Sequence, residues 1–325
     1  MLIGHKRPWE FLTKSAQRGK LAHAYLFYGP AEVGKRTLAW RFSQWLLCQN
    51  RKNQNETFCS RCSACQSLEK NQHPDFFWLE PPREENKGII KTLSIGIDEI
   101  KKLQHQLSLT PYSADYKIAL IDGLEYLTDQ ALNSFLKILE EPPRQSLIFL
   151  IATDWQGLLP TIISRCQLIK FLPVPEKEIF AGLKERAVLN DNLRRIVKLA
   201  VGRPGRAIKM LENKDLLLAY NHNVSLFEKI LKQDLSYRFE LVEDIAKDNL
   251  LAQEFLGQFS LWLRDQLLLS SGLSDLAIDE KILTGKRLMP KVVADCISFV
   301  EQTRRFLSNP SFNAKLALEV LMLKL

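Results

Sequence analysis

Apolar runs of strand length alternate with amphipathic segments through the first half of the chain. Four runs have the length and composition of buried strands: Ala24–Tyr28, Phe76–Leu79, Lys117–Ile121 and Leu147–Ala152. Apolar residues at helical spacing follow Lys35 and recur over Ile97–Leu107 and after Thr128, which can cap a helix that Pro142 stops. Strands that alternate with helices predict a parallel sheet with helices on both sides.

Two prolines, Pro173 and Pro175, mark a change of pattern and indicate a hinge. The next segment, 176–212, predicts a small helical unit interrupted by Gly202–Gly205, and from about Asp215 onward every segment has helical periodicity. We therefore expect three parts: an α/β core over 1–170, a small helical lid over 171–213 and an all-α domain over 214–325.

Composition narrows the class of protein. Of the 325 residues, 46% are apolar and 25% charged, as in ordinary soluble globular proteins. No apolar run approaches the roughly 18 residues of a membrane span, and the charged segment Met1–Glu10 does not resemble a signal peptide, so we expect a cytoplasmic protein with no membrane partner. The net charge of +8 leaves open whether the partner is an anion such as nucleic acid, because no dense basic run accompanies it.

A phosphate-binding loop is indicated between the first strand and the helix that follows it. Gly29, Gly34 and Lys35 occupy the glycine and lysine positions of the pattern G-x-x-x-x-G-K-[ST]. In such a loop, backbone N–H groups at a helix N-terminus surround the phosphates, and the lysine neutralises the terminal ones. The eighth position, which normally supplies a hydroxyl to Mg²⁺, is Arg36, and Thr37 lies about 100° further round the helix.

The strand that would complete an ATP site is also not followed by the usual catalytic glutamate. It ends in Asp122, a carboxylate suited to a metal site, but the next position, where ATPases place a water-activating Glu, is Gly123. Glu125 comes two residues later and is a poor substitute. With two catalytic positions missing, we expect no ATP hydrolysis. Nucleotide binding stays open, and so does the interpretation that the loop is kept only for folding.

Four of the six cysteines are clustered in the sequence. Cys59, Cys62 and Cys65 follow a C-x₂-C-x₂-C spacing, and Cys48 precedes them at the end of a predicted helix. In a reducing compartment such clusters hold metal more often than they form disulfides, and four thiolates suit tetrahedral Zn²⁺. An iron–sulfur cluster is the alternative. Because four thiolates leave no open position on the metal, we expect a structural zinc in an insert over 48–65.

Further motifs accompany the phosphate loop and the cysteines, in order along the chain: Leu21–Gly29, His73–Asp75, Ala131–Pro143 and Leu159–Cys166. Together they resemble the bacterial clamp-loader subunits, AAA+ proteins that open the sliding clamp of DNA polymerase III. The resemblance is strong over about 1–212 and extends to the rest only in helical character. Within the family it is greatest to the delta-prime subunits, because a degenerate phosphate loop accompanies an intact Ser164-Arg165-Cys166 motif and a single helical domain follows.

The resemblance implies a fold, partners and residue roles. The fold would be an AAA+ P-loop core, a lid and a C-terminal helical collar that mediates oligomerisation. The partners would be the gamma or tau and delta subunits, the sliding clamp and primed DNA. Arg165 would be an arginine finger that reaches the ATP site of a neighbouring subunit, Thr153 would occupy the sensor-1 position and Arg206 the sensor-2 position. A guanidinium suits a finger because it is always charged and fork-shaped.

Two alternatives stay open beside a non-hydrolysing clamp-loader subunit. The first is an active ATPase like the gamma and tau subunits, which keep the Lys-Thr or Lys-Ser and Asp-Glu pairs from which Arg36 and Gly123 depart. The second is a zinc-dependent DNA-binding module, although Arg61 is the only base between the last three cysteines, too few for reading a DNA groove.

Overall fold

The computed structural model of the chain describes residues 2–51, 58–86, 89–153, 155, 157–184, 192–278, 289–307 and 312–325. The chain divides into two compact units, Met1–Leu189 with Ala200–Ala207, and Asn190–Leu199 with Ile208–Leu325. The finer boundaries expected near residues 170 and 213 stay predictions. Within the described residues, no helix combines the length and the apolar character that crossing a membrane requires.

The first unit is built on a five-stranded sheet. Its strands are β1 (Ala24–Tyr28), β2 (Phe76–Leu79), β5 (Lys117–Asp122), β6 (Ser146–Ala152) and β7 (Gln167–Lys170). They are arranged in the order β2-β5-β6-β1-β7, and every pairing is parallel. A separate antiparallel pair is formed by β3 (Arg83–Asn86) and β4 (Ile89–Thr92). The predicted parallel α/β core is confirmed.

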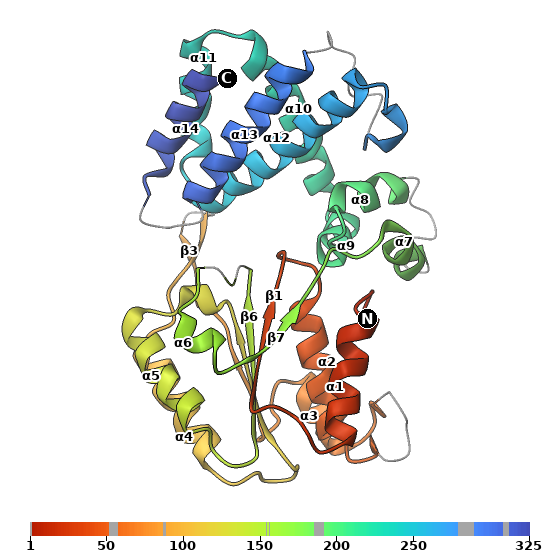
Figure 1. Cartoon of the computed structure of the whole chain (residues 1–325), viewed down its shortest axis with the longest axis vertical. Coiled ribbons are helices and arrows are strands. Elements are labelled where there is room, and N and C mark those ends of the chain that lie inside the picture. The colour runs from red at the N-terminus through yellow and green to blue at the C-terminus, as the bar shows by residue number, and fades with distance from the viewer. Residues whose placement is uncertain are drawn as a thin grey trace. The chain divides into compact units, whose positions relative to one another are not determined.

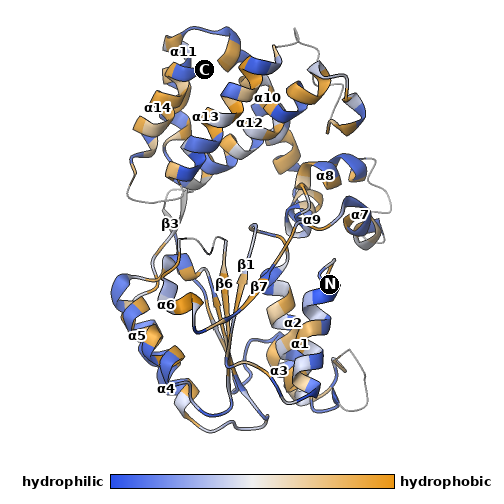
Figure 2. Ribbon diagram, in the orientation of Figure 1, coloured by the Kyte–Doolittle hydropathy of each residue, from blue (hydrophilic) through white to orange (hydrophobic). Residues whose placement is uncertain are grey.

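Helices cover both faces of this sheet (Figure 1). One side carries α1 (Lys6–Gln17), α2 (Lys35–Leu47) and α3 (Ser63–Glu69), and the other carries α4 (Ile97–Ser108), α5 (Asp129–Glu140) and α6 (Pro160–Ile163). Because side chains alternate along a strand, Leu26 joins the core under α4 and α5, whereas Phe149 meets Phe42 of α2 with ring centres 5.9 Å apart. Figure 2 shows β6 as mostly apolar and helices such as α1 and α5 as carrying both apolar and polar residues. Burying a large apolar side chain of this kind contributes about 1.5–3 kcal/mol.

The start of α5 has the expected cap. The Thr128 side chain accepts a hydrogen bond from Ala131 N (3.2 Å) at the start of α5, as predicted. The helices α7 (Glu176–Lys184), α8 (Leu193–Ala200) and α9 (Pro204–Glu212) come next in the chain. The break between α8 and α9 includes Gly202, whose φ of 71° favours glycine.

The rest of the second unit is helical over the residues that the structure describes, as the periodicity predicted. It contains α10 (Lys214–Lys232), α11 (Leu235–Ile245), α12 (Asn249–Ser270), the short η3 (Ser274–Leu276), α13 (Pro290–Leu307) and α14 (Ala314–Lys324). Phe227 of α10 stacks on Phe259 of α12, with ring centres 4.9 Å apart, and Phe255 and Trp262 flank the same ring. These aromatic residues form the core between α10 and α12.

Candidate functional site

The residues of the predicted nucleotide site lie along one edge of the sheet. The loop after β1 runs from Gly29 to Lys35, Asp122 ends β5, and Thr153 follows β6. Because β5, β6 and β1 are neighbours in a parallel sheet, their carboxyl ends adjoin. This edge is where open α/β sheets bind ligands.

Residues outside the phosphate-loop motif contact the loop, and the sequence motifs did not indicate them. His5 Nε2 donates a hydrogen bond to the carbonyl oxygen of Val33 (2.7 Å), and burial lowers the pKa of His5. Gly29 has a φ of 141°, and a side chain there would collide with the carbonyl oxygen of Phe171. At the start of α9, Gly205 N donates to Glu32 O (2.9 Å). Arg206, which is half-buried, directly follows Gly205, so the residue before it in the chain is hydrogen-bonded to the phosphate loop.

The side chain of Lys35 points back toward the backbone of its own loop. Its ammonium group donates to the carbonyl oxygens of Gly29 and Pro30, and the residue is only 5% exposed. Burial lowers the pKa of Lys35 to about 8, although the Glu125 and Asp122 carboxylates act to raise it. The charge expected to meet a terminal phosphate is therefore held by backbone oxygens of the chain itself.

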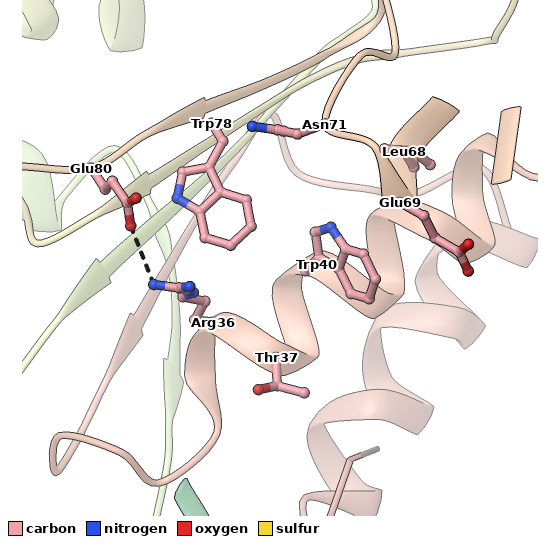
Figure 3. A pocket seen from close by; sticks show the side chains of 8 residues that line it. All are labelled: Arg36, Thr37, Trp40, Leu68, Glu69, Asn71, Trp78 and Glu80. Carbon is pink, nitrogen blue, oxygen red and sulfur yellow. Dashed lines mark hydrogen bonds and ion pairs between the residues drawn. The ribbon is translucent and has the colours of Figure 1, made fainter. Parts of the chain in front are cut away.

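Arg36 lies where the magnesium-binding hydroxyl of an ATPase is expected. Its Nη1 is 3.2 Å from Glu80 Oε2, and its guanidinium carbon is 4.4 Å from the centre of the Trp78 ring; Figure 3 shows these three side chains. The same Nη1 is 3.5 Å from Asp122 Oδ2. Burial raises the pKa of Asp122, while the Arg36 charge acts to lower it. The Arg36 guanidinium is thus paired with Asp122, the carboxylate that would bind a metal ion, and its positive charge opposes Mg²⁺ binding there.

A pocket of about 520 Å³ opens beside this guanidinium. It is lined by residues of α2, of α3 and the turn after it, and of β2 and the residue after it: Arg36, Thr37, Trp40, Leu68, Glu69, Asn71, Trp78 and Glu80 (Figure 3). Thr37 lines this pocket, which includes neither Gly29 nor Lys35 of the phosphate loop.

A glutamate at the position after Asp122 would be strained in this backbone. Gly123 has a φ of 88°, and a Cβ there would lie 2.9 Å from the Tyr126 ring. Glu125, in the short helix η2 (Leu124–Tyr126), instead accepts a hydrogen bond from Thr153 Oγ1 (2.8 Å). The Glu125–Thr153 pair was not predicted. Its only sequence signal is that both residues follow apolar strands.

The four cysteines come together as the spacing predicted. Cys48 caps the end of α2, Cys62 caps the start of α3, and the four sulfur atoms all lie within 4.8 Å of one another. Backbone N–H groups of Cys59, Cys62 and Cys65 donate to sulfur atoms of the cluster at 3.3–3.5 Å. The cluster links α2 to α3 and can hold a metal ion.

The donor set fits a tetrahedral metal. Sulfur atoms about 2.3 Å from a zinc ion lie about 3.8 Å apart, and the Sγ atoms of Cys59 and Cys65 are 4.0 Å apart. Burial raises the pKa of Cys48 and of Cys65, whereas backbone N–H groups of Arg61 and Cys62 lower that of Cys59 to about 6. A bound dication is what would allow all four thiols to ionise together.

Arg165 lies at the α6–β7 junction, and within the described residues its hydrogen bonds do not involve the nucleotide-site residues. Its Nη1 donates to Thr161 O (3.0 Å) and to Ser164 Oγ (3.3 Å), and its Nη2 donates to Glu140 Oε1 (2.9 Å). The side chain keeps about a third of its surface exposed (34%). The three candidate sites are therefore separate in the described structure: the sheet edge, the cysteine cluster and Arg165.

Comparisons with known proteins identify the family. The family profile described as "DNA polymerase III, delta subunit" matches residues 4–175, more than half of the chain. A DNA polymerase III subunit delta' of Pseudomonas aeruginosa is 30% identical over 327 residues, covering 98% of this chain and 96% of the relative. The chain belongs to the DNA polymerase III delta-prime family.

Other members of the family agree with this assignment. The Bacillus subtilis delta' subunit is 27% identical over 98% of this chain and 95% of its own length. The Escherichia coli delta' subunit is 30% identical over 63% of this chain, which spans 60% of that relative. Among solved structures, a gamma subunit-related protein of Thermotoga maritima matches 97% of each chain at 19% identity, with a TM-score of 0.49. The family assignment rests on the sequence comparisons.

Proposed function

We propose that this delta-prime family member is a non-hydrolysing subunit of the DNA polymerase III clamp loader. In this role it helps gamma or tau and delta subunits to load the sliding clamp onto primed DNA, in the cytoplasm. The observation that carries the proposal is the ion pair between Arg36 and Asp122, which fills the metal side of the ATP site with a cation of the protein. With no glutamate at Gly123, the chain is not an ATPase by itself. An active gamma- or tau-like ATPase is disfavoured by the same two residues.

Arg165 is the residue by which the chain would contribute to ATP hydrolysis in the assembly. We infer that it acts as an arginine finger on the ATP site of a neighbouring motor subunit. Its guanidinium is partly exposed and is tethered at the end of a short helix, which supports a role outside its own nucleotide site. A guanidinium placed beside the transferring phosphoryl group stabilises the charge that develops there.

The test is Arg165→Ala in a reconstituted clamp loader. We expect normal assembly and a loss of ATP turnover at the site that receives the finger, where fingers contribute about 10³- to 10⁵-fold. The loss in total turnover will be smaller because the other ATP sites keep their own fingers. Arg165→Lys should restore little, since an ammonium group lacks the planar fork. The control is Arg144→Ala, which removes an exposed arginine outside the motif. Unchanged DNA-stimulated turnover and clamp loading in a complete Arg165→Ala complex would refute the finger.

We also infer that the cysteine cluster holds one structural Zn²⁺, bound by Cys48, Cys59, Cys62 and Cys65. The mutual distances of the sulfur atoms and the N–H groups directed at them support four thiolates around one ion. The metal would fix the insert on the core. With every coordination position taken by sulfur, it would have no part in catalysis.

A further inference from the structure

Arg165 is restrained by one residue from outside its own turn. Thr161 and Ser164 lie within four residues of it in the chain, whereas Glu140 is the last residue of α5. The Glu140 carboxylate is thus the contact that ties the guanidinium to a separate element. Its oxygen accepts from Nη2 at 2.9 Å, the geometry of a charge-assisted hydrogen bond.

The position of Glu140 is unfavourable apart from this contact. A negative charge at a helix C-terminus is repelled by the partial negative charge of the last carbonyl groups. Glu140 and the following Glu141 are both exposed at that end of α5. Packing therefore does not require a carboxylate here, and its stabilising partner in the structure is Arg165.

The hydrogen bonds to Arg165 leave its Nε–H available. The hydrogen bonds described for the side chain use Nη1 and Nη2, and none within the described residues uses Nε. The Nε–H can therefore donate to an oxygen of a phosphoryl group without displacing Glu140. Glu140 and a phosphoryl group can consequently bind the guanidinium at the same time, so the carboxylate orients the finger and does not compete with its target.

We propose that Glu140 is a positioning residue that holds the Arg165 guanidinium in place and leaves its Nε–H for the nucleotide of the neighbouring subunit. The proposal rests on the proposed function, because it requires Arg165 to act in trans. Orientation before the reaction matters since a free arginine side chain samples many rotamers, and a finger helps only in the one that meets the transition state.

The experiment uses complete clamp-loader complexes reconstituted with four variants: Glu140→Ala, Glu140→Gln, Glu141→Ala and Glu140→Ala combined with Arg165→Ala. Single-turnover phosphate release separates the affected site from the others. We expect Glu140→Ala to slow that site about two- to fivefold, the range for one exposed charge pair, with the KM for ATP unchanged. Glu140→Gln, which keeps an acceptor oxygen, should be intermediate. Glu141→Ala, the matched loss of a neighbouring carboxylate, should leave the rate unchanged.

The double variant distinguishes positioning from structural damage. If Glu140 acts through Arg165, Glu140→Ala adds no further loss once Arg165 is alanine. A rate that is unchanged or raised in Glu140→Ala alone, or an equal loss in both backgrounds, overturns the inference while the finger stands. If Arg165→Ala itself has no effect, the proposed function fails first, and the inference fails with it.

Discussion

Lys35 donates to two carbonyl oxygens of its own loop, and the adjacent Arg36 is paired with Glu80 and Asp122. In an ATPase the corresponding groups would face a phosphate and a magnesium ion. Here both positions are satisfied by the protein, so the loop can fold without either ligand. Gly123 adds a backbone obstacle, because a side chain at its φ of 88° would be strained and would meet the Tyr126 ring.

Restoring one residue should therefore not restore catalysis. We expect purified Arg36→Ser, which returns a hydroxyl to the metal position, to release phosphate no faster than the same chain carrying Lys35→Ala. The reason is that no carboxylate at position 123 can activate water. Steady-state phosphate release at saturating ATP and Mg²⁺ measures this. Turnover clearly above the Lys35→Ala chain would show that Glu125 serves as the base.

The buried Lys35 ammonium makes stability depend on pH at the alkaline end. Its pKa in the folded chain is lowered to about 8, whereas an unfolded lysine titrates near 10.4. Between these values the unfolded state binds more protons, so stability rises with pH. Relative to Lys35→Met, the wild-type free energy of unfolding should increase from about pH 8 to 10, by up to about 1.4 kcal/mol per pH unit. Urea unfolding at pH 7, 8.5 and 10 checks this. A constant difference would mean that Lys35 is better solvated than its burial indicates.

At the scale of elements, the strands with buried apolar runs were the most predictable. β1 and β2 have the predicted bounds, and β5 and β6 are each one residue longer than predicted. Helix α1 was not assigned, although its residues are amphipathic. The four-residue edge strand β7 was not assigned because a short, half-exposed strand gives weak periodicity. Sheet order could not be derived, since it depends on contacts between distant segments.

In the candidate site, too, local patterns could be predicted from the sequence and long-range contacts could not. The phosphate loop and the cysteines are local patterns, and spacing alone indicated them. The pairs Arg36–Asp122, Glu125–Thr153 and Glu140–Arg165 join residues 25 or more positions apart. They follow from strand order and from the docking of α5 beside α6, which no local pattern encodes.

The cysteine cluster links two elements, so its loss should have a local effect. We expect one zinc per chain by native mass spectrometry and none in Cys65→Ala, whose sulfur is buried in the first turn of α3. Hydrogen exchange should accelerate over residues 58–70 and stay slow in β1 and β6, because the sheet core does not depend on the metal. Cys296→Ala removes a buried cysteine outside the cluster and should keep the zinc. Iron in place of zinc, or no metal in the wild type, would refute the site.

For the molecule as a whole, α14 is a helix with apolar residues on both its buried and its exposed sides. Leu318, Leu321 and Met322 are buried within the second unit, yet Leu316 and Leu323 on the same helix are 59% and 60% exposed. A helix that is apolar around its circumference is typical of one covered on all sides. This supports the proposal that the C-terminal helical region joins neighbouring subunits of the clamp loader.

Charging that exposed face should weaken assembly without unfolding the chain. Leu316→Glu with Leu323→Glu places two carboxylates seven residues apart, on one side of α14, where they would be desolvated by a partner but remain in water in the free chain. We expect circular dichroism and the thermal midpoint to stay near wild type, while incorporation into the complex falls at least tenfold in a reconstitution followed by size-exclusion chromatography. The matched control is Leu276→Glu, which charges a leucine that is 59% exposed in the same unit but lies in η3 and not on α14. Incorporation of the double variant at the wild-type level would remove α14 from the interface. An equal loss with Leu276→Glu would show that added charge, and not the α14 face, is responsible.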